Sequence, residues 1–260
     1  MVIEFFKYQG TGNDFIIIDN RSNVFDRDNV GFVAEICDRR FGIGADGLML
    51  LQEAEGYDFE MLYYNSDGST STMCGNGGRC LVAFANKLGL AAGQKGVFLA
   101  VDGPHEYQLK EDLVSLKMID VKSWEAVGSD YFLHTGSPHY VSFCQDVILQ
   151  DVERLGRAVR YNDRFKEQGT NVNYCEFDDG RLVVRTYERG VESETLSCGT
   201  GVTAAALVFG LSHPEMNIIP VSTKGGNLQV SFERKSEGFD NVWLTGPATF
   251  VYRGFIDIPS

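Results

Sequence analysis

Two cysteines stand directly before glycines at distant points of the chain, and they are the residues best suited to do chemistry. Cys74 lies in the stretch MCGNGGRC at residues 73–80, and Cys198 lies in SCGTG at residues 197–201. Each stretch predicts the start of a buried helix. A cysteine at a helix N-terminus lies near backbone N–H groups and about half a positive elementary charge, which favours the thiolate. Each of the two is therefore a candidate base or nucleophile.

The glycines that follow the cysteines indicate the kind of ligand. Glycine lets the backbone approach a ligand closely, and successive N–H groups at a helix start suit a carboxylate or another anion. Two such cysteines on opposite sides of one anion-binding cleft suit a particular task. One would remove a proton from a carbon and the other would deliver a proton to the opposite face, which inverts a stereocentre.

An internal repeat relates the two motifs. The cysteines are 124 positions apart, and several other residues obey the same offset without a gap. The matching pairs are Thr11-Gly12 with Thr135-Gly136, Tyr63 with Tyr187, Ser69 with Ser193, Gly75 with Gly199 and Gly77 with Gly201. We therefore expect two similar domains, residues 1–115 carrying Cys74 and residues 116–248 carrying Cys198, with a last strand in 249–260 that returns to the first.

The order of local patterns predicts an α+β fold. Strand-like runs are short, and the segments DDG at 178–180 and KGGN at 224–227 are typical of hairpins, so adjacent strands should pair antiparallel. Two helices carry almost no charge, so they should be buried. The prediction is two pseudo-symmetric domains, each an antiparallel, strand-rich, barrel-like sheet wrapped around a central buried helix. The helical patterns cover residues 29–40, 74–88, 152–161 and 198–211.

Composition narrows the class of protein. With 43% hydrophobic and 23% charged residues, the chain has the balance of a globular protein that buries a sizeable core. A formal net charge of -13 repels phosphate backbones, which argues against nucleic-acid binding and favours a small-molecule enzyme. The first residues lack a secretory signal, and no apolar run reaches membrane-spanning length, so we expect a cytoplasmic protein that does not enter a membrane.

The remaining cysteines and the histidines do not suggest other chemistry. Six cysteines are too few for a disulfide scaffold, and Cys37, Cys80, Cys144 and Cys175 are interpreted as buried core residues. No histidine lies at metal-motif spacing with a cysteine pair, so no metal is expected. The segment GIGADG at 42–47 matches G-x-G-x-x-G, but a helix precedes it and a strand follows, so it is interpreted as a cleft loop. A two-cysteine redox protein stays open as an alternative, although no C-x-x-C occurs.

With these motifs in place, the whole chain resembles the diaminopimelate epimerase family. The signatures are YQGTGNDF at 8–15, residues 65–80 around Cys74, and ERG at 188–190 through Cys198 to residue 201. The resemblance implies a homodimeric isomerase that interconverts LL- and meso-diaminopimelate on the route to lysine and peptidoglycan. It also implies that the enzyme uses no pyridoxal phosphate or other cofactor.

The resemblance assigns roles residue by residue. Cys74 and Cys198 would be the acid and base, one as thiolate and one as thiol, with His139 and Glu188 supporting them. The N–H groups of four residues would hold the carboxylate at the reacting carbon, and a second set of polar side chains would read the rest of the substrate, with Arg189 suited to a distal carboxylate. The first set is Gly75, Asn76, Gly199 and Thr200, and the second set is Asn13, Asn65, Asn171, Glu188 and Arg189.

Three departures from the family pattern concern substrate-side contacts. Gly47 stands where many members have glutamine, Ser137 stands where many have asparagine, and GVESETLS at 190–197 is one residue longer. Proline and hydroxyproline racemases, which resemble the same family, remain an alternative. They typically carry histidine after Cys-Gly, where this chain has Asn76.

Overall fold

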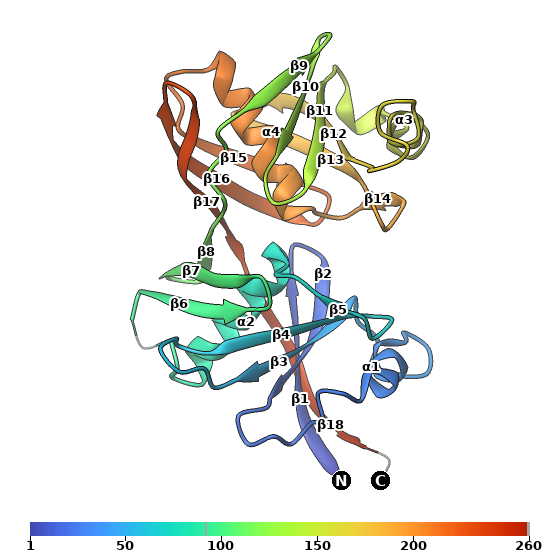
Figure 1. Cartoon of the computed structure of the whole chain (residues 1–260), viewed down its shortest axis with the longest axis vertical. Helices are drawn as coiled ribbons and strands as arrows, with labels where there is room; N and C mark the ends of the chain where they lie inside the picture. Colours follow the sequence, from blue (N-terminus) through green and yellow to red (C-terminus); the bar gives the residue numbers. More distant parts are fainter. Residues whose placement is uncertain (92, 259–260) are drawn as a thin grey trace. The chain divides into compact units, whose positions relative to one another are not determined.

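The computed structural model describes residues 1–91 and 93–258, and its contacts form two compact units (Figure 1). The first unit comprises Met1–Leu116 and the chain from Pro247 onward, and the second comprises Lys117–Gly246. Each unit is strand-rich and contains one long helix surrounded by strands (Figure 1). The predicted α+β class is confirmed. None of the helices in the described residues is long and apolar enough to cross a membrane.

Helix α2 forms the centre of the first unit. Its sequence between Arg79 and Lys87 is free of charge, and the side chains of Cys80, Leu81, Val82 and Phe84 are fully buried against the surrounding strands. The elements of this unit are β1 (Val2–Gly10), β2 (Asn13–Asp19), α1 (Val30–Cys37), β3 (Gly47–Gln52), β4 (Glu60–Asn65), β5 (Thr70–Ser71), α2 (Gly75–Lys87), β6 (Lys95–Ala100), β7 (Gly103–Lys110), β8 (Leu113–Lys117) and β18 (Thr249–Asp257).

Helix α4 has the same place in the second unit. It carries no charged residue, and it is buried on all sides from Gly201 to Gly210, as the sequence predicted. The elements of this unit are β9 (Trp124–Val127), β10 (Asp130–His134), β11 (Pro138–Phe143), η1 (Val147–Leu149), α3 (Val152–Arg160), β12 (Asn171–Asp178), β13 (Arg181–Glu188), β14 (Ser193–Thr195), α4 (Gly199–Ser212), β15 (Ile218–Thr223), β16 (Gly226–Lys235) and β17 (Gly238–Pro247).

Local signals for turns and helix ends are largely confirmed. Strands β12 and β13 form a hairpin whose loop residues Asp179 and Gly180 have φ of 45° and 77°, and β15 and β16 form the other predicted hairpin. Asn29 accepts a hydrogen bond from the N–H of Phe32 and so caps α1. The helix ends at Cys37, earlier than predicted, because the Asp38 carboxylate accepts hydrogen bonds from the next N–H groups and forms a turn.

The prediction that adjacent strands pair antiparallel is wrong for part of each unit. Strand β2 pairs parallel with β3, and β11 pairs parallel with β12. In each case the connection contains a helix, α1 or α3, which brings the chain back to the same end of the sheet. The sheets are therefore mixed, with antiparallel hairpins joined by helical crossovers.

The strand registers extend the repeat and correct one of its pairs. In the first unit Phe15 pairs with Gly47, and in the second His139 pairs with Asn171, which is the same pairing 124 positions later. The next strand departs from this offset. Met49 pairs with Tyr63, whereas its counterpart Asn173 pairs with Thr186. Tyr63 therefore corresponds to Thr186 in the structure and not to Tyr187.

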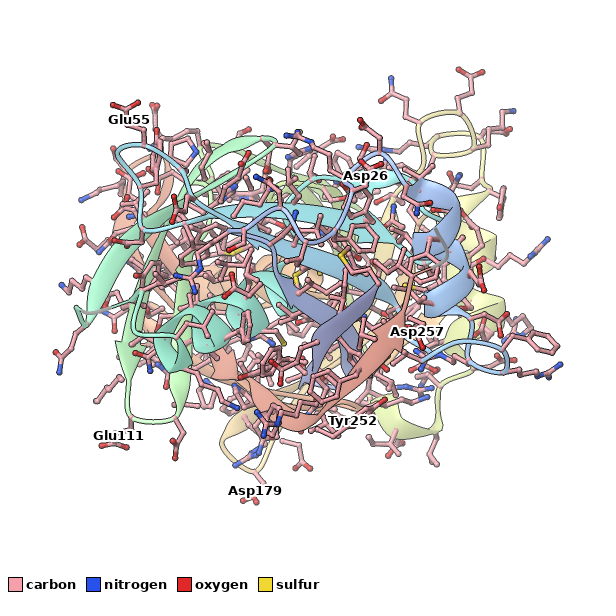
Figure 2. The ribbon with its side chains drawn as sticks, turned by 90° about the horizontal axis from the view of Figure 1, so that it is seen from below. Asp26, Glu55, Glu111, Asp179, Tyr252 and Asp257 are labelled. Atoms are coloured by element: carbon pink, nitrogen blue, oxygen red, sulfur yellow. The ribbon has the colours of Figure 1, made fainter. Side chains whose placement is uncertain are left out.

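The two ends of the described chain lie together. Strand β1 pairs antiparallel with β18, and the N–H of Ile258 donates to the carbonyl oxygen of Met1 (Figure 1). Most residues of β18 are exposed, and Figure 2 labels Tyr252 and Asp257 on this strand. The last strand therefore belongs to the first unit.

Candidate active site

Cys74 begins helix α2, beside two predicted site residues. It is the N-cap residue, with extended φ and ψ of −100° and 128°, so the helix runs from Gly75 and its first N–H groups have no carbonyl partner inside the helix. The Sγ atom lies 3.7 Å from Asn13 Oδ1, and Asn76 Nδ2 lies 3.4 Å from the same oxygen. The structure thus brings Cys74, Asn13 and Asn76 together.

The orientation of Asn13 is set by Asp46, which the sequence did not single out. Asn13 Nδ2 donates to Asp46 Oδ2 over 2.6 Å, and a carboxylate can only accept here. The amide oxygen of Asn13 must therefore face Cys74. Asp46 belongs to the GIGADG segment, of which residues 42–46 form a loop before β3, and Arg39 donates to its other oxygen over 2.6 Å. That this loop lines a cleft stays a prediction.

Asp14 joins this loop to a buried lysine. Its carboxylate accepts hydrogen bonds from Arg39 over 2.6 Å and 3.1 Å, and it forms an ion pair with Lys7 Nζ at 2.6 Å. Lys7 also donates to the carbonyl oxygen of Gly44. Burial raises the pKa of Asp14, but the hydrogen bonds from Arg39 and Lys7 outweigh it and lower the pKa from 3.8 to about 2.

We expect Asp14→Asn to remove an acid-dependent part of the stability. Because the folded-state pKa lies below the unfolded value, the stabilisation is complete above about pH 4 and is lost as the pH falls towards about 2. Its full size is at most about 2 kcal/mol. Urea unfolding at a series of pH values should show a flatter profile for the variant. Asp163→Asn, at a fully exposed carboxylate, is the control and should leave the profile unchanged.

Arg79 is a fully buried cation on the same helix. Its guanidinium donates to Asn76 Oδ1 over 3.0 Å, to Thr11 Oγ1 over 3.2 Å and to the carbonyl oxygens of Gly75 and Pro247. Thr11 Oγ1 also lies 3.3 Å from Asn76 Oδ1. Burial lowers the pKa of Arg79 from its ordinary value. These contacts hold the side chain of Asn76 in the orientation that turns its amide nitrogen to Asn13.

Cys198 begins helix α4 in a matching way. Its φ and ψ of −114° and 112° are extended, and the helix runs from Gly199. Thr200 Oγ1 lies 3.5 Å from Cys198 Sγ and 2.9 Å from His139 Nε2, and Thr135 donates to the carbonyl oxygen of Thr200 over 2.8 Å. Thr135 is the repeat counterpart of Thr11, and both threonines contact the second residue of their helix.

His139 is wholly buried under the start of α4. Burial, followed by the neighbouring charges of His134 and Arg189, lowers the pKa of His139 to about 3, so the ring is neutral at physiological pH. Asn173, which the sequence did not suggest, lies 3.2 Å from the other ring nitrogen, Nδ1. The site histidine is therefore held by side chains on both of its nitrogens.

Asn171, Arg189 and Ser137 form a second group in the same unit. Asn171 Oδ1 accepts from the N–H of Arg189 over 2.9 Å, and its Nδ2 donates to Ser137 Oγ over 2.9 Å. The guanidinium of Arg189 donates to the carbonyl oxygen of Gln168 and lies 3.5 Å from Ser137 Oγ. Ser137, one of the departures from the family pattern, thus takes part in positioning the arginine.

Asn65 and Glu188 lie at the ends of corresponding strands. Asn65 donates to Ser69 Oγ over 3.1 Å, and Glu188 Oε2 accepts from Thr195 Oγ1 over 2.9 Å. Gly47 lies beside Asn65 in the register, and a Cβ there would lie 2.5 Å from the carbonyl oxygen of Tyr64. The chain therefore has no room for a glutamine at residue 47 in this backbone conformation.

Several polar residues of these two groups were missed by the sequence reasoning. Asn173 and Thr186 lie in strands that carry several other polar residues, so the local pattern does not mark them, and their burial emerges only from the structure. Thr11 and Thr135 were detectable, since they obey the repeat offset. The missed set is Thr11, Asp46, Arg79, Thr135, Asn173 and Thr186.

Comparison with known proteins gives the family. The family model described as diaminopimelate epimerase matches residues 5–123 and 131–251. A diaminopimelate epimerase of Flavobacterium psychrophilum is 48% identical over 253 residues, which cover 96% of this chain and 98% of the relative. One of Chlorobaculum tepidum is 43% identical, with 96% of this chain and 99% of the relative covered.

Solved structures agree in fold at much lower identity. A phenazine biosynthesis protein of the PhzF family from Bacillus anthracis superimposes with a TM-score of 0.76 at 13% identity, covering 99% of this chain and all of that one. A hydroxyproline epimerase from Agrobacterium vitis superimposes with a TM-score of 0.68 at 13% identity, covering 98% and 92%. At such identity the likeness concerns the fold alone, whereas the full-length sequence matches decide the family. The chain belongs to the diaminopimelate epimerase family.

Proposed function

We propose that this chain interconverts LL- and meso-2,6-diaminopimelate without a cofactor, using Cys74 and Cys198 as the acid and base. The observation that carries the proposal is that each unit places a cysteine at the N-cap of its central buried helix, in a chain of this family. The product and substrate are precursors of lysine and peptidoglycan. On this basis we also propose that the protein acts in the cytoplasm.

The proposed reaction moves one proton off the α-carbon and another onto it. The thiolate of one cysteine takes the α-proton, which leaves the electron pair on carbon, and the thiol of the other cysteine gives its proton to the opposite face. The first cysteine ends as thiol and the second as thiolate. This form is competent for the reverse reaction, and exchange of the two protons with solvent restores the first form for another forward turnover. Atoms and charge balance without an oxidant or an electron sink.

Stabilisation of the developing negative charge is the hard part of this chemistry. The start of each helix supplies backbone N–H groups that need no reorganisation, from Gly75 and Asn76 in one unit and Gly199 and Thr200 in the other. We propose that these groups hold the carboxylate next to the reacting carbon. Asp46 and Arg79 support the first group through Asn13 and Asn76.

The distal end of the substrate would be read by the polar side chains that the family resemblance named. We propose that Arg189 grips the distal carboxylate and that Asn13, Asn65, Asn171 and Glu188 bind the remaining polar atoms. Support comes from the contacts of Asn171, which hold the backbone N–H of Arg189 and the hydroxyl of Ser137 at 2.9 Å each. His139 would support the second motif as a neutral ring.

The test is exchange and inversion measured together. Reduced protein is incubated with LL-diaminopimelate in deuterated water, with a chelator and without pyridoxal phosphate. We expect deuterium at the α-position as meso product accumulates. Absence of both, from protein shown to be folded, would contradict the substrate assignment, and proline and hydroxyproline are the next substrates to try. Full activity of a reversibly oxidised Cys74–Cys198 form would instead favour the redox reading.

We also propose that two copies associate through strand β18, most of which is exposed. This strand exposes large apolar side chains, of which Phe255 is 69% exposed and Val251 52% exposed. Large exposed apolar side chains are typical of protein interfaces. The other exposed apolar residues of the strand are Phe250 and Tyr252.

We expect Phe255→Glu to convert a dimer to a monomer, because a carboxylate at the centre of an apolar interface is buried without a partner. Light scattering coupled to size-exclusion chromatography gives the mass directly. Leu149→Glu is the matched control, since Leu149 is 81% exposed in the other unit. A wild-type monomer at micromolar concentration, or a Phe255 variant that remains dimeric, would contradict this interface.

A further inference from the structure

The residues beneath the two central helices differ in kind although their places correspond. In the first unit, a Cβ on Gly77 would meet Met49 and Phe15 at 3.2 Å and 3.4 Å. In the second unit, a Cβ on Gly201 would lie 2.4 Å from Asn173 Oδ1. The strand registers make His139 the counterpart of Phe15, and Asn173 the counterpart of Met49.

The polar pair is therefore not required by the fold. The first unit fills these positions with Phe15 and Met49, both fully buried, and forms the same strand pairing. His139 and Asn173 are also fully buried, and buried polar groups lower stability unless each is hydrogen-bonded. A polar pair at places where apolar residues serve equally well indicates a role beyond packing.

The amide of Asn173 has one allowed orientation. Its Nδ2 donates to the carbonyl oxygen of Tyr140 over 2.9 Å, and its Oδ1 accepts from Thr186 Oγ1 over 2.9 Å. Rotating the amide would place Oδ1 against the carbonyl oxygen of Tyr140, where two acceptors would repel. The second hydrogen of Nδ2 therefore faces His139 Nδ1 at 3.2 Å.

This orientation decides which nitrogen of His139 carries the proton. Since Nδ1 faces a donor, it must present its lone pair, and the neutral ring carries its hydrogen on Nε2. That hydrogen points to Thr200 Oγ1 at 2.9 Å. Asn171 Nδ2 also lies 3.5 Å from Nε2, but its hydrogens are directed to Ser137 Oγ at 2.9 Å and to the carbonyl oxygen of Pro138 at 3.0 Å.

The hydroxyl of Thr200 completes the series of hydrogen bonds that begins at the carbonyl oxygen of Tyr140. Because its oxygen accepts from His139, its own hydrogen is directed to another neighbour, and Cys198 Sγ lies 3.5 Å away. A hydroxyl that donates to sulfur favours thiolate over thiol. The direction of each hydrogen bond is defined from the carbonyl oxygen of Tyr140 to Thr200 Oγ1. Between Thr200 Oγ1 and Cys198 Sγ either atom can donate, and the hydrogen bond that Thr200 Oγ1 accepts from His139 favours the hydroxyl as the donor.

We propose that Asn173 and His139 are positioning residues that turn the Thr200 hydroxyl towards Cys198, so that the substrate-free protein presents an O–H donor to this cysteine and stabilises its thiolate. Neither residue transfers a proton. Burial of His139 lowers its pKa to about 3 and keeps the ring neutral, and so preserves the order of donors and acceptors along these hydrogen bonds. The relevance to catalysis rests on the proposed function, but the arrangement itself does not.

The direction of these hydrogen bonds is tested by finding which ring nitrogen of His139 carries the hydrogen. Nitrogen NMR of protein labelled at histidine distinguishes the two neutral tautomers. We expect His139 to show hydrogen on Nε2 at neutral pH. Asn173→Leu, which removes the donor to Nδ1 at similar volume, should give a mixture of tautomers. Wild-type protein with hydrogen on Nδ1, or an unchanged signal in Asn173→Leu, would overturn the proposal.

The effect on Cys198 is measured by the ultraviolet absorbance of its thiolate in a Cys74→Ser background. Burial raises the pKa of the other four thiols, to about 11 for Cys37 and about 12 for Cys80, so thiolate absorbance that appears below about pH 9 is assigned to Cys198. Thr200→Val should lower the thiolate fraction about tenfold at a given pH, and Thr200→Ser should restore it. The other two thiols whose pKa is raised by burial are Cys144 and Cys175.

Thr186→Val is the matched control within the same network. It makes the same chemical change as Thr200→Val, but the lost hydroxyl donates to Asn173 Oδ1 and leaves the Nδ2 contacts in place. We expect its tautomer and thiolate titration to match wild type even if it is less stable. A Thr200→Val titration equal to wild type, or an equal shift in Thr186→Val, would overturn the proposal. Both readouts use substrate-free protein, so they are independent of activity on diaminopimelate.

Discussion

Replacing Cys74 or Cys198 by alanine will reduce epimerisation about 10²- to 10⁴-fold in each case, because each variant lacks one partner of the proton transfer. The two variants should still differ in a measurable way. The remaining cysteine can take the α-proton only from the isomer whose α-proton points towards it. It can then return solvent deuterium to the same face of the carbon. We therefore expect one variant to exchange only the LL isomer at this carbon and the other only the meso isomer.

Exchange without inversion, measured by NMR and chiral chromatography, separates this outcome from loss of folding. Cys37→Ala is the control, since burial raises the pKa of Cys37 to about 11 and the side chain packs in the core. It should keep wild-type inversion even if it is less stable. Inversion by either motif variant at more than about a tenth of the wild-type rate would contradict a two-cysteine mechanism.

Gly201→Ala is expected to destabilise the second unit by about 1–3 kcal/mol, although alanine is the better helix former. The added Cβ would lie 2.4 Å from Asn173 Oδ1 and 3.3 Å from Thr186 Oγ1. Because both atoms are held in hydrogen bonds beneath α4, they cannot yield without breaking a contact. Denaturant unfolding followed by circular dichroism gives the change in free energy.

Gly31→Ala in α1 is the matched substitution. Nothing lies within 4 Å of the added Cβ there, so propensity alone acts and the variant should gain about 0.5–1 kcal/mol. A loss of stability in Gly201→Ala together with a gain in Gly31→Ala would show that the glycine of the second cysteine motif is kept for close packing. Equal stability of Gly201→Ala and wild type would show that the polar group beneath α4 can move.

The two units reach similar cysteine environments by different means. At Cys74, the neighbour Asn13 is oriented by a carboxylate, Asp46, and presents an amide oxygen. At Cys198, the neighbour Thr200 is oriented by His139 and presents a hydroxyl. Duplication thus kept the helix start and changed the side chains beneath it.

The sequence by itself determined the features that depend on neighbouring residues. The cysteine and glycine motifs, the uncharged stretches of α2 and α4, the capping of α1 by Asn29 and the hairpin at Asp179-Gly180 all follow from local conformational preferences. The resemblance to the family followed from the same motifs, and the full-length matches confirm it.

Only the tertiary structure decided which distant residues meet. The parallel pairing of β2 with β3 depends on a helical connection. Strand register makes Thr186, and not Tyr187, the counterpart of Tyr63 in the repeat. Local patterns encode neither feature. The support of Asn13 by Asp46, and of His139 by Asn173, joins residues 33 and 34 positions apart. A polar residue in a strand has many potential partners, and its role is defined only when folding excludes water and leaves one of them within hydrogen-bond distance.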